Sequence, residues 1–356
     1  MSKRLRNRRL PLVLALAAAL PFAAQADDQG HDHQPKDLSG VEVKATPLVG
    51  TAEDLVRPVD VLAGAKLDEV KANSLGETVG KLPGVQSSYF GPGVGRPIVR
   101  GFDGARVQVL SDGLGSGDVS TVSVDHAVSI EPFLADQIEV LKGPATLLYG
   151  SGAIGGAVNV VDGRIARELP DRPLSGRAEL RGNSVNDERS GMFRLDGVSG
   201  NVVLHVDGLV RNGDDYRIPG YAVIDGLEDH SGHDHEEGDS DEPRRGRLDN
   251  SSVRTRAGGV GATWLGDDGY FGVSASTYRT NYGIPNGAHV HAEDDHGHDH
   301  DHDHDHGDEE EGDEHDVRID MVQNRFETKA GIYNPVSFLK NINARVAYTD
   351  LSLIHI

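Results

Sequence analysis

From about Leu174 onward the chain is a series of segments, each roughly ten residues long, in which apolar and polar side chains alternate. In one of them Val202, Leu204, Val206 and Val210 can face one side of a strand, while His205, Asp207 and Leu209 face the other. Similar segments span 177–181, 253–265, 270–282, 317–331 and 342–348. The pattern is typical of an outer-membrane β-barrel, whose residues face lipid and lumen in turn. A soluble β-domain outside the cytoplasm shows the same alternation, so periodicity alone leaves both open.

The chain between about residues 40 and 161 is different. Short runs rich in β-branched residues at 41–43, 59–62, 107–110, 138–141 and 158–161 are separated by glycine turns. Helices are predicted over 66–72 and over 74–81. The second has Ser74 as N-cap with Glu77 three residues later, and Pro83-Gly84 stops it. These elements predict a small α/β domain.

The N-terminus has the layout of a secretory signal peptide. A basic segment lies within residues 3–9, an apolar run covers 10–20, and Ala24-Gln25-Ala26 offers a cleavage site before Asp27. A membrane anchor is the alternative, but the apolar run is far shorter than the ~20 residues that a spanning helix needs. The chain has no cysteine. Disulfides and cysteine-ligated metals are therefore excluded, which leaves histidine and carboxylates as the strong metal ligands.

Histidine and acidic residues are concentrated in two insertions between the alternating segments. The segment 288–316 holds nine histidines and fourteen acidic residues and no lysine or arginine, and Asp and His alternate from 298 to 306. Alternation places the imidazoles on one side of an extended backbone, and imidazole suits zinc, nickel and copper. The candidate ligands are His289, His291, His296, His298, His300, His302, His304 and His306, with His230, His233 and His235 in the smaller insertion at 227–242. The alternative is a solvated acidic run with incidental histidines.

The net charge of −22 comes from these insertions alone. The insertion 227–242 holds eight acidic residues and the insertion 288–316 holds fourteen, and neither contains a lysine or an arginine. The rest of the chain therefore has equal numbers of acidic and basic residues. A chain that binds nucleic acid needs basic surface to neutralise phosphates. The charge pattern therefore argues against nucleic acid as a partner.

Asp125 and His126 form a second candidate metal site, between the predicted strands at 107–110 and 138–141. A carboxylate and an imidazole that are adjacent in a loop can approach one metal ion if the backbone turns. A turn in which Asp125 accepts backbone hydrogen bonds is an equally good interpretation of the same residues. Neither H-E-x-x-H nor a similar helical pair occurs, so we expect no metallohydrolase and no enzyme.

Three motifs resemble the plug of TonB-dependent outer-membrane receptors. They are Val99-Arg100-Gly101-Phe102-Asp103-Gly104 with its continuation to Gly113, the stretch from Ile138 to Val161 around Lys142-Gly143-Pro144, and Leu82-Pro83-Gly84-Val85. Upstream, Val41, Glu42, Val43, Lys44 and Ala45 are similar to the TonB box, which pairs with TonB by β-augmentation. The resemblance implies an α/β plug domain over 47–163, followed by the first strands of an antiparallel transmembrane β-barrel over 174–356.

The same resemblance sets the remaining boundaries and partners. Residues 1–26 are the expected signal peptide, 27–46 an N-terminal segment with the TonB box at about 38–45, and 227–242 and 288–316 extracellular loops. The implied partners are TonB with ExbB and ExbD, and outer-membrane lipid. No cofactor is implied, because a divalent metal would be the transported ligand.

Asp125 and His126 with the His-rich loops resemble the zinc-uptake branch of this family. The resemblance implies that both bind zinc together with a glutamate and a histidine from the barrel. Glu327 is the candidate glutamate, because Phe326, Thr328 and Ala330 suit the lipid side. A simple ion pair between Glu327 and its basic neighbours is the alternative. No residue is assigned as the barrel histidine.

The length departs from the family. A plugged transporter has 22 strands, whereas the residues after the plug suffice for about eight crossings at ~10 residues each. We expect an N-terminal fragment, with a tail foreign to the protein after about Asp350. Nickel, copper, haem or a ferric siderophore are alternative ligands, and a secreted metal-binding protein is the alternative class.

Overall fold

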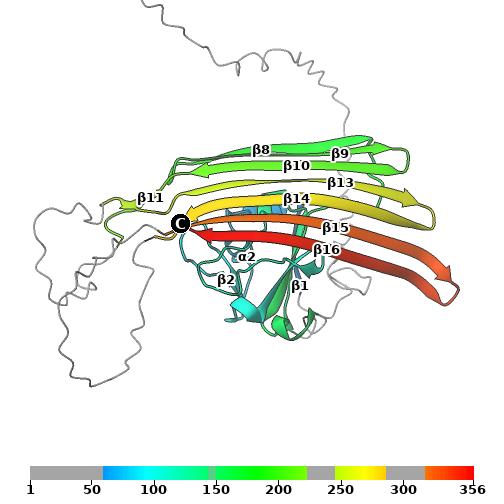
Figure 1. Cartoon of the computed structure of the whole chain (residues 1–356), viewed down its shortest axis with the longest axis horizontal. Coiled ribbons are helices and arrows are strands. Elements are labelled where there is room, and N and C mark those ends of the chain that lie inside the picture. Colours follow the sequence, from blue (N-terminus) through cyan, green and yellow to red (C-terminus); the bar gives the residue numbers. More distant parts are fainter. Residues whose placement is uncertain (1–58, 144–145, 147–148, 223–244, 286–316) are drawn as a thin grey trace, which may run out of the picture. The chain divides into compact units, whose positions relative to one another are not determined.

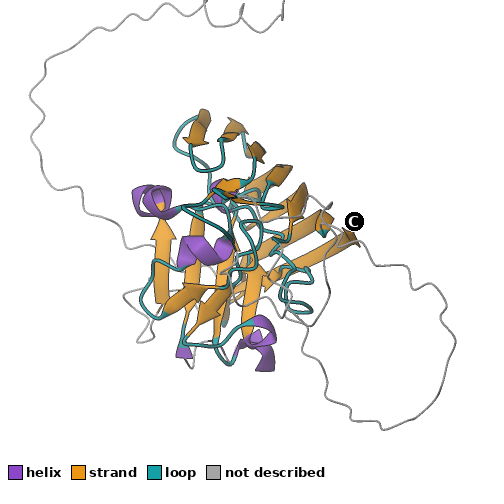
Figure 2. Ribbon diagram, turned by 90° about the vertical axis from the view of Figure 1, so that its left-hand side faces the viewer, coloured by secondary structure: helices purple, strands orange, loops and turns teal. Residues whose placement is uncertain are grey.

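A computed structural model describes residues 59–143, 146, 149–222, 245–285 and 317–356 (Figure 1). The predicted signal peptide, the TonB box and the histidines of both insertions lie outside the described residues. No helix in the described ranges is long and apolar enough to cross a membrane. Figure 2 shows that strands make up most of this part and that its helices are short.

The first group of elements forms a small α/β domain. In chain order they are β1 (Val59–Ala63), α1 (Gly64–Val70), α2 (Leu75–Val79), β2 (Val85–Ser87), β3 (Pro97–Val99), η1 (Gly104–Arg106), β4 (Val107–Ser111), β5 (Leu114–Gly115), η2 (Pro132–Leu134), β6 (Gln137–Leu141), η4 (Ser151–Ala153) and β7 (Gly156–Val161). Five strands pair in the order β1-β6-β7-β4-β5, and only the β4–β7 pair is parallel. The predicted β-branched runs from residue 59 onward are therefore confirmed as strands.

Local sequence explains where helix α2 begins and ends. The Ser74 hydroxyl accepts a hydrogen bond from the Glu77 backbone N–H at 3.3 Å and donates to the Glu77 carboxylate at 3.2 Å, as the capping pattern predicts. The helix ends at Val79, two residues before the predicted end, because Gly80 is its C-cap and the Leu82 N–H turns back to the Val79 carbonyl.

The second group of strands forms one antiparallel sheet (Figure 1). Its members are β8 (Leu174–Asn183), β9 (Glu188–Ser199), β10 (Val202–Gly213), β13 (Val253–Gly266), β14 (Gly269–Gly283), β15 (Arg318–Val336) and β16 (Leu339–His355). The short strands β11 (Tyr216–Arg217) and β12 (Arg247–Leu248) pair separately between β10 and β13. The seven strands follow chain order across the sheet, so each connects to its neighbour as a meander. Strand β9 was absent from the prediction, because charged residues and glycines interrupt its alternation.

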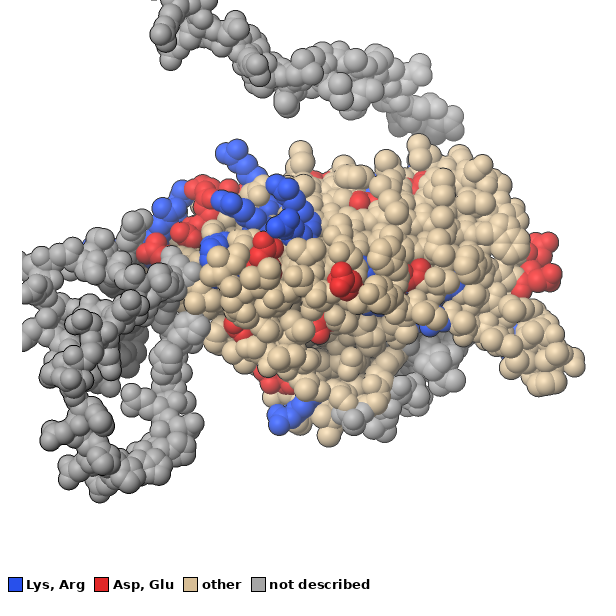
Figure 3. All heavy atoms as spheres, viewed as in Figure 1, with Lys and Arg blue, Asp and Glu red and all other residues tan. Residues whose placement is uncertain are grey.

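The alternation in sequence becomes two faces of this sheet. Leu204, Val206 and Val210 are exposed on one face of β10, whereas His205 and Asp207 are buried on the other, as predicted. On β15, likewise, Phe326 is exposed. Further exposed apolar side chains on the outer face include Phe193, Val260, Trp264, Phe271, Val273, Val346 and Tyr348. In Figure 3 the visible face of the sheet carries few charged side chains, and lysine and arginine gather near one end.

A chain of buried ion pairs joins the α/β domain to the sheet. Arg164, which follows β7, donates to Asp207 on β10 through Nε at 2.7 Å and Nη2 at 3.0 Å. His205 lies between Asp207, 2.9 Å from its Nε2, and Asp196 on β9, 2.7 Å from its Nδ1. Both ring nitrogens face carboxylates, which only accept hydrogen bonds, so the geometry fits a protonated imidazole. We refer to Arg164, Asp207, His205 and Asp196 as the clasp.

Candidate metal centre

Asp125 and His126 lie in the long loop between β5 and η2. The loop is held by Arg96, whose Nη1 donates to the Ser120 carbonyl at 2.8 Å. Within the loop, Asp118 accepts hydrogen bonds from the backbone N–H and the hydroxyl of Ser120, at 3.1 and 2.6 Å. These contacts place both candidate ligands on a loop that side-chain hydrogen bonds fix from several directions.

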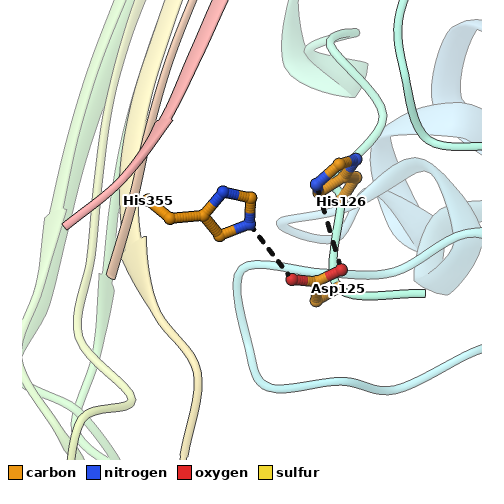
Figure 4. Close-up of side chains that lie close together, drawn as sticks. All are labelled: Asp125, His126 and His355. Carbon is orange, nitrogen blue, oxygen red and sulfur yellow. Dashed lines mark ion pairs between the residues drawn. The ribbon is translucent and has the colours of Figure 1, made fainter. Parts of the chain in front are cut away.

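The His126 ring is oriented by the backbone. Its Nδ1 lies 3.1 Å from the Val119 carbonyl oxygen, which can only accept, so in the neutral ring Nδ1 carries the proton and Nε2 has the lone pair. Nε2 is turned toward Asp125 and lies 4.0 Å from its Oδ1 (Figure 4). A hydrogen bond from the second ring nitrogen to a carbonyl is the usual way in which proteins orient a metal-binding histidine. His126 thus presents a free nitrogen beside a carboxylate.

The Asp125 carboxylate is favoured in its ionised form. Partial burial raises its pKa, but the hydrogen bonds that the carboxylate accepts from the Ser123 hydroxyl and from its own backbone N–H hold the pKa below the ordinary value of 3.8. The carboxylate therefore remains an anionic ligand at neutral pH. The turn that the sequence left as an alternative is thus present, and it leaves the carboxylate close to His126.

His355, near the end of β16, brings a second imidazole to this pair. Its Nε2 lies 3.4 Å from Asp125 Oδ2, and its ring centroid is 5.4 Å from that of His126 (Figure 4). One ligand atom of each of the three residues lies within 4.8 Å of the others. Within the described ranges they form the only such group of three or more His, Cys, Asp or Glu. His355 belongs to the tail that the sequence predicts to be foreign, so the site proposed below rests on Asp125 and His126.

Glu327 is not brought to this site. It faces the buried side of β15, as predicted, but its carboxylate lies 2.6 Å from Arg325 Nε and 3.6 Å from Lys329 Nζ. Lys329 also contacts Asp112 of the α/β domain at 3.0 Å. The negative charge of Glu327 is thus balanced by Arg325 and Lys329, which is the ion-pair alternative given above. We therefore leave Glu327 out of the proposed metal site.

Sequence reasoning overlooked two groups. It gave His355 no role, because the residue falls in the tail predicted to be foreign. It also placed His205 and Asp207 on the inner face without seeing that Arg164 and Asp196 would meet them. The only available signal was the run of polar residues at inward positions of β10, which does not identify a partner distant in sequence.

Comparison with known proteins follows the same division of the chain. The family model described as TonB-dependent Receptor Plug Domain matches residues 51–157. Residues 51–157 thus match the plug domain of the family that the sequence motifs resemble. The match includes Asp125 and His126, so the candidate metal pair lies in the plug. The antiparallel sheet from β8 to β16 follows it and resembles in fold the barrel strands of these receptors, as the sequence predicts.

Curated relatives extend the similarity beyond the plug. Vitamin B12 transporter BtuB of Photobacterium profundum is 29% identical over 150 residues, which are 42% of this chain and 24% of that protein. The ferrioxamine receptor of Yersinia enterocolitica is 25% identical over 231 residues, 58% of this chain and 30% of that protein. The hemin receptor of Yersinia pestis is 29% identical over 151 residues, 41% and 22% of the two chains. The chain thus spans less than a third of each relative's length.

Solved structures show the same fold. The alcaligin outer-membrane receptor FauA from Bordetella pertussis superposes with a TM-score of 0.57 and 14% identity, over 88% of this chain and 42% of that one. The copper transporter OprC superposes with a TM-score of 0.55 and 19% identity, over 78% and 35%. The relatives are named as transporters and receptors, which agrees with the prediction of no enzyme. Their names specify several ligands and not zinc, so the zinc-uptake branch stays a prediction.

Proposed function

We propose that this chain is part of a TonB-dependent outer-membrane receptor that takes up a divalent metal ion, and that the ion is zinc. The observation that carries the proposal is the plug pair. The His126 imidazole has its lone pair turned toward an ionised Asp125, and both are held by backbone and hydroxyl contacts. Imidazole nitrogen with carboxylate oxygen is a donor set for zinc and similar borderline ions, whereas calcium and magnesium prefer oxygen alone.

The position of the pair supports a route from the outer His-rich segment. The segment 286–316 connects the end of β14 to the start of β15, and the Ile284 N–H donates to the Val317 carbonyl at 3.0 Å where the two strands come together. Ala127, next to the metal pair, packs in one apolar cluster with Ile284 and Ile319. Metal bound by the segment's histidines would therefore be concentrated beside the plug pair.

Release would follow from movement of the plug. TonB, with ExbB and ExbD, would pair with the TonB box at 41–45 from the inner side and displace the plug. Transport needs an ion that is bound tightly in one state and weakly in the other. The plug supplies two ligands, and the barrel supplies the remaining ones, so separation of plug from barrel would dismantle the site.

Uptake by cells tests this function. Cells that make the complete receptor are grown with scarce zinc, with and without TonB, and the accumulated zinc is measured. We expect TonB-dependent uptake that is lost in D125A/H126A and kept in D267A/D268A, a control double substitution in the exposed turn between β13 and β14. TonB-dependent uptake of haem, a ferric siderophore or copper without uptake of zinc would contradict the choice of metal.

A further inference from the structure

Tyr282, near the end of β14, forms hydrogen bonds through its hydroxyl group to the backbone on both sides of His126. Its Oη donates to the Asp125 carbonyl oxygen at 3.0 Å and accepts from the Ala127 backbone N–H, also at 3.0 Å. The two contacts flank His126 on either side. The peptide groups that set the direction of both metal-binding side chains are therefore tied to a barrel strand.

The plug encloses the ring of this tyrosine. Tyr282 is fully buried in a cluster that includes Val94 and Ala127 of the plug and Ile284, Ile319 and Met321 of the barrel. A Cβ at Gly93 would lie 2.5 Å from the Tyr282 Cβ and 2.6 Å from its Cγ. The absence of a side chain at Gly93 is thus what admits the ring. The hydroxyl cannot leave the His126 peptides unless the plug moves relative to β14.

We propose that Tyr282 is a positioning residue that makes the metal affinity of Asp125 and His126 depend on contact between plug and barrel. The inference rests on the proposed function and explains how the metal ion would be released when the plug moves. In the seated plug, Tyr282 holds the two peptides that aim the ligands. When the plug shifts, both hydrogen bonds break together, the pair loses its fixed geometry, and affinity falls.

The Tyr282→Phe variant tests the inference in the complete receptor, because it removes only the hydroxyl and keeps the packed ring. Loss of an outer contact that orients metal ligands typically lowers metal affinity about 10- to 100-fold, and we expect zinc affinity to fall by that factor in calorimetry. The visible spectrum of bound cobalt(II), which reports ligand geometry, should change as well. The matched control is Tyr270→Phe, which removes a hydroxyl from a buried tyrosine of the same strand that donates to Asn343 at 3.4 Å.

A measurement on the unaltered receptor covers the case in which Tyr282→Phe does not fold. The Ala127 amide donates to Tyr282, so its hydrogen exchange should slow when zinc binds, since both events stabilise one loop geometry. Unchanged zinc affinity and cobalt spectrum in Tyr282→Phe, or Ala127 exchange that ignores zinc, would overturn the inference. If D125A/H126A loses zinc binding in the same experiment, the proposed function survives that result. If D125A/H126A keeps it, the proposed function fails first.

Discussion

The clasp between plug and barrel should depend most on Asp207. Asp207 accepts two hydrogen bonds from Arg164 and one from His205, and its side chain is 2% exposed. The Asp207→Asn variant keeps the shape and removes the charge that both cations share. Removal of one partner from a buried ion pair typically costs about 3–5 kcal/mol.

The structure places the effect at the lower end of that range. Arg164 keeps Asp162, 2.6 Å from its Nη1, and His205 keeps Asp196 at 2.7 Å, so neither cation is left without an anion. We therefore expect about 3 kcal/mol. Since each 1.4 kcal/mol is a factor of ten, this corresponds to roughly a 100-fold rise in the population in which residues 162–166 detach from the barrel.

Hydrogen exchange of the Ala166 amide reads out this detachment, because that N–H donates to the Thr263 hydroxyl of β13 at 3.0 Å. The control is Asp187→Asn, which breaks an ion pair with Arg217 whose side chains are 52% and 60% exposed. Exposed ion pairs contribute at most about 1 kcal/mol to the free energy of unfolding. Among the described residues, the side-chain hydrogen bonds of Asp187 and Arg217 are with each other and with Ser184, and not with the plug. If Asp207→Asn leaves Ala166 exchange as slow as the control does, the clasp does not hold the plug.

Three further predictions concern the metal site and its surroundings. The Ser123→Ala variant should raise the pKa of Asp125, because it removes a hydrogen bond to the carboxylate; the stability that the lowered pKa supplies is present above the unfolded value of 3.8 and is lost as pH falls through the folded value. Melting curves should therefore show a deficit at neutral pH that disappears in acid, and equal curves at all pH would contradict this role of Ser123. The Gly93→Ala variant should cost about 1–3 kcal/mol by overpacking and weaken zinc binding, because the new Cβ meets Tyr282; Gly197→Ala, where nothing lies within 4 Å, should do neither in the same melts and titrations. Deletion of residues 289–315 should slow uptake at scarce zinc while tight binding persists, and loss of all tight binding would place the principal site in that segment.

Much of the architecture could be predicted from the sequence, because it depends on local patterns. Alternation along β10 and β15 placed His205 inward and Phe326 outward, and the Ser74–Glu77 cap placed the start of α2. Strand β9 was missed because its polar and glycine residues hide the period. Motif resemblance found the plug, since its stretches are long and specific.

Only part of the candidate metal site could be predicted from the sequence, for a physical reason. Asp125 and His126 are adjacent in sequence, so their shared loop was visible. Tyr282 lies more than 150 residues away and meets them only through the packing of β14 against the plug, a contact that no local pattern encodes. Glu327 was chosen by the face of its strand, but the same face brings Arg325 and Lys329 beside it, and neighbouring charge decided its partner.

Zinc calorimetry on the complete receptor and on D125A/H126A shows whether Asp125 and His126 hold the ion. Nickel, copper and haem are titrated in parallel, with D267A/D268A as a control double substitution in an exposed turn away from the pair. We expect one tight zinc site in the unaltered receptor and in the control, and its loss in D125A/H126A. A tight zinc site that survives the double substitution, or tight binding of haem in place of zinc, would contradict a zinc site at Asp125 and His126.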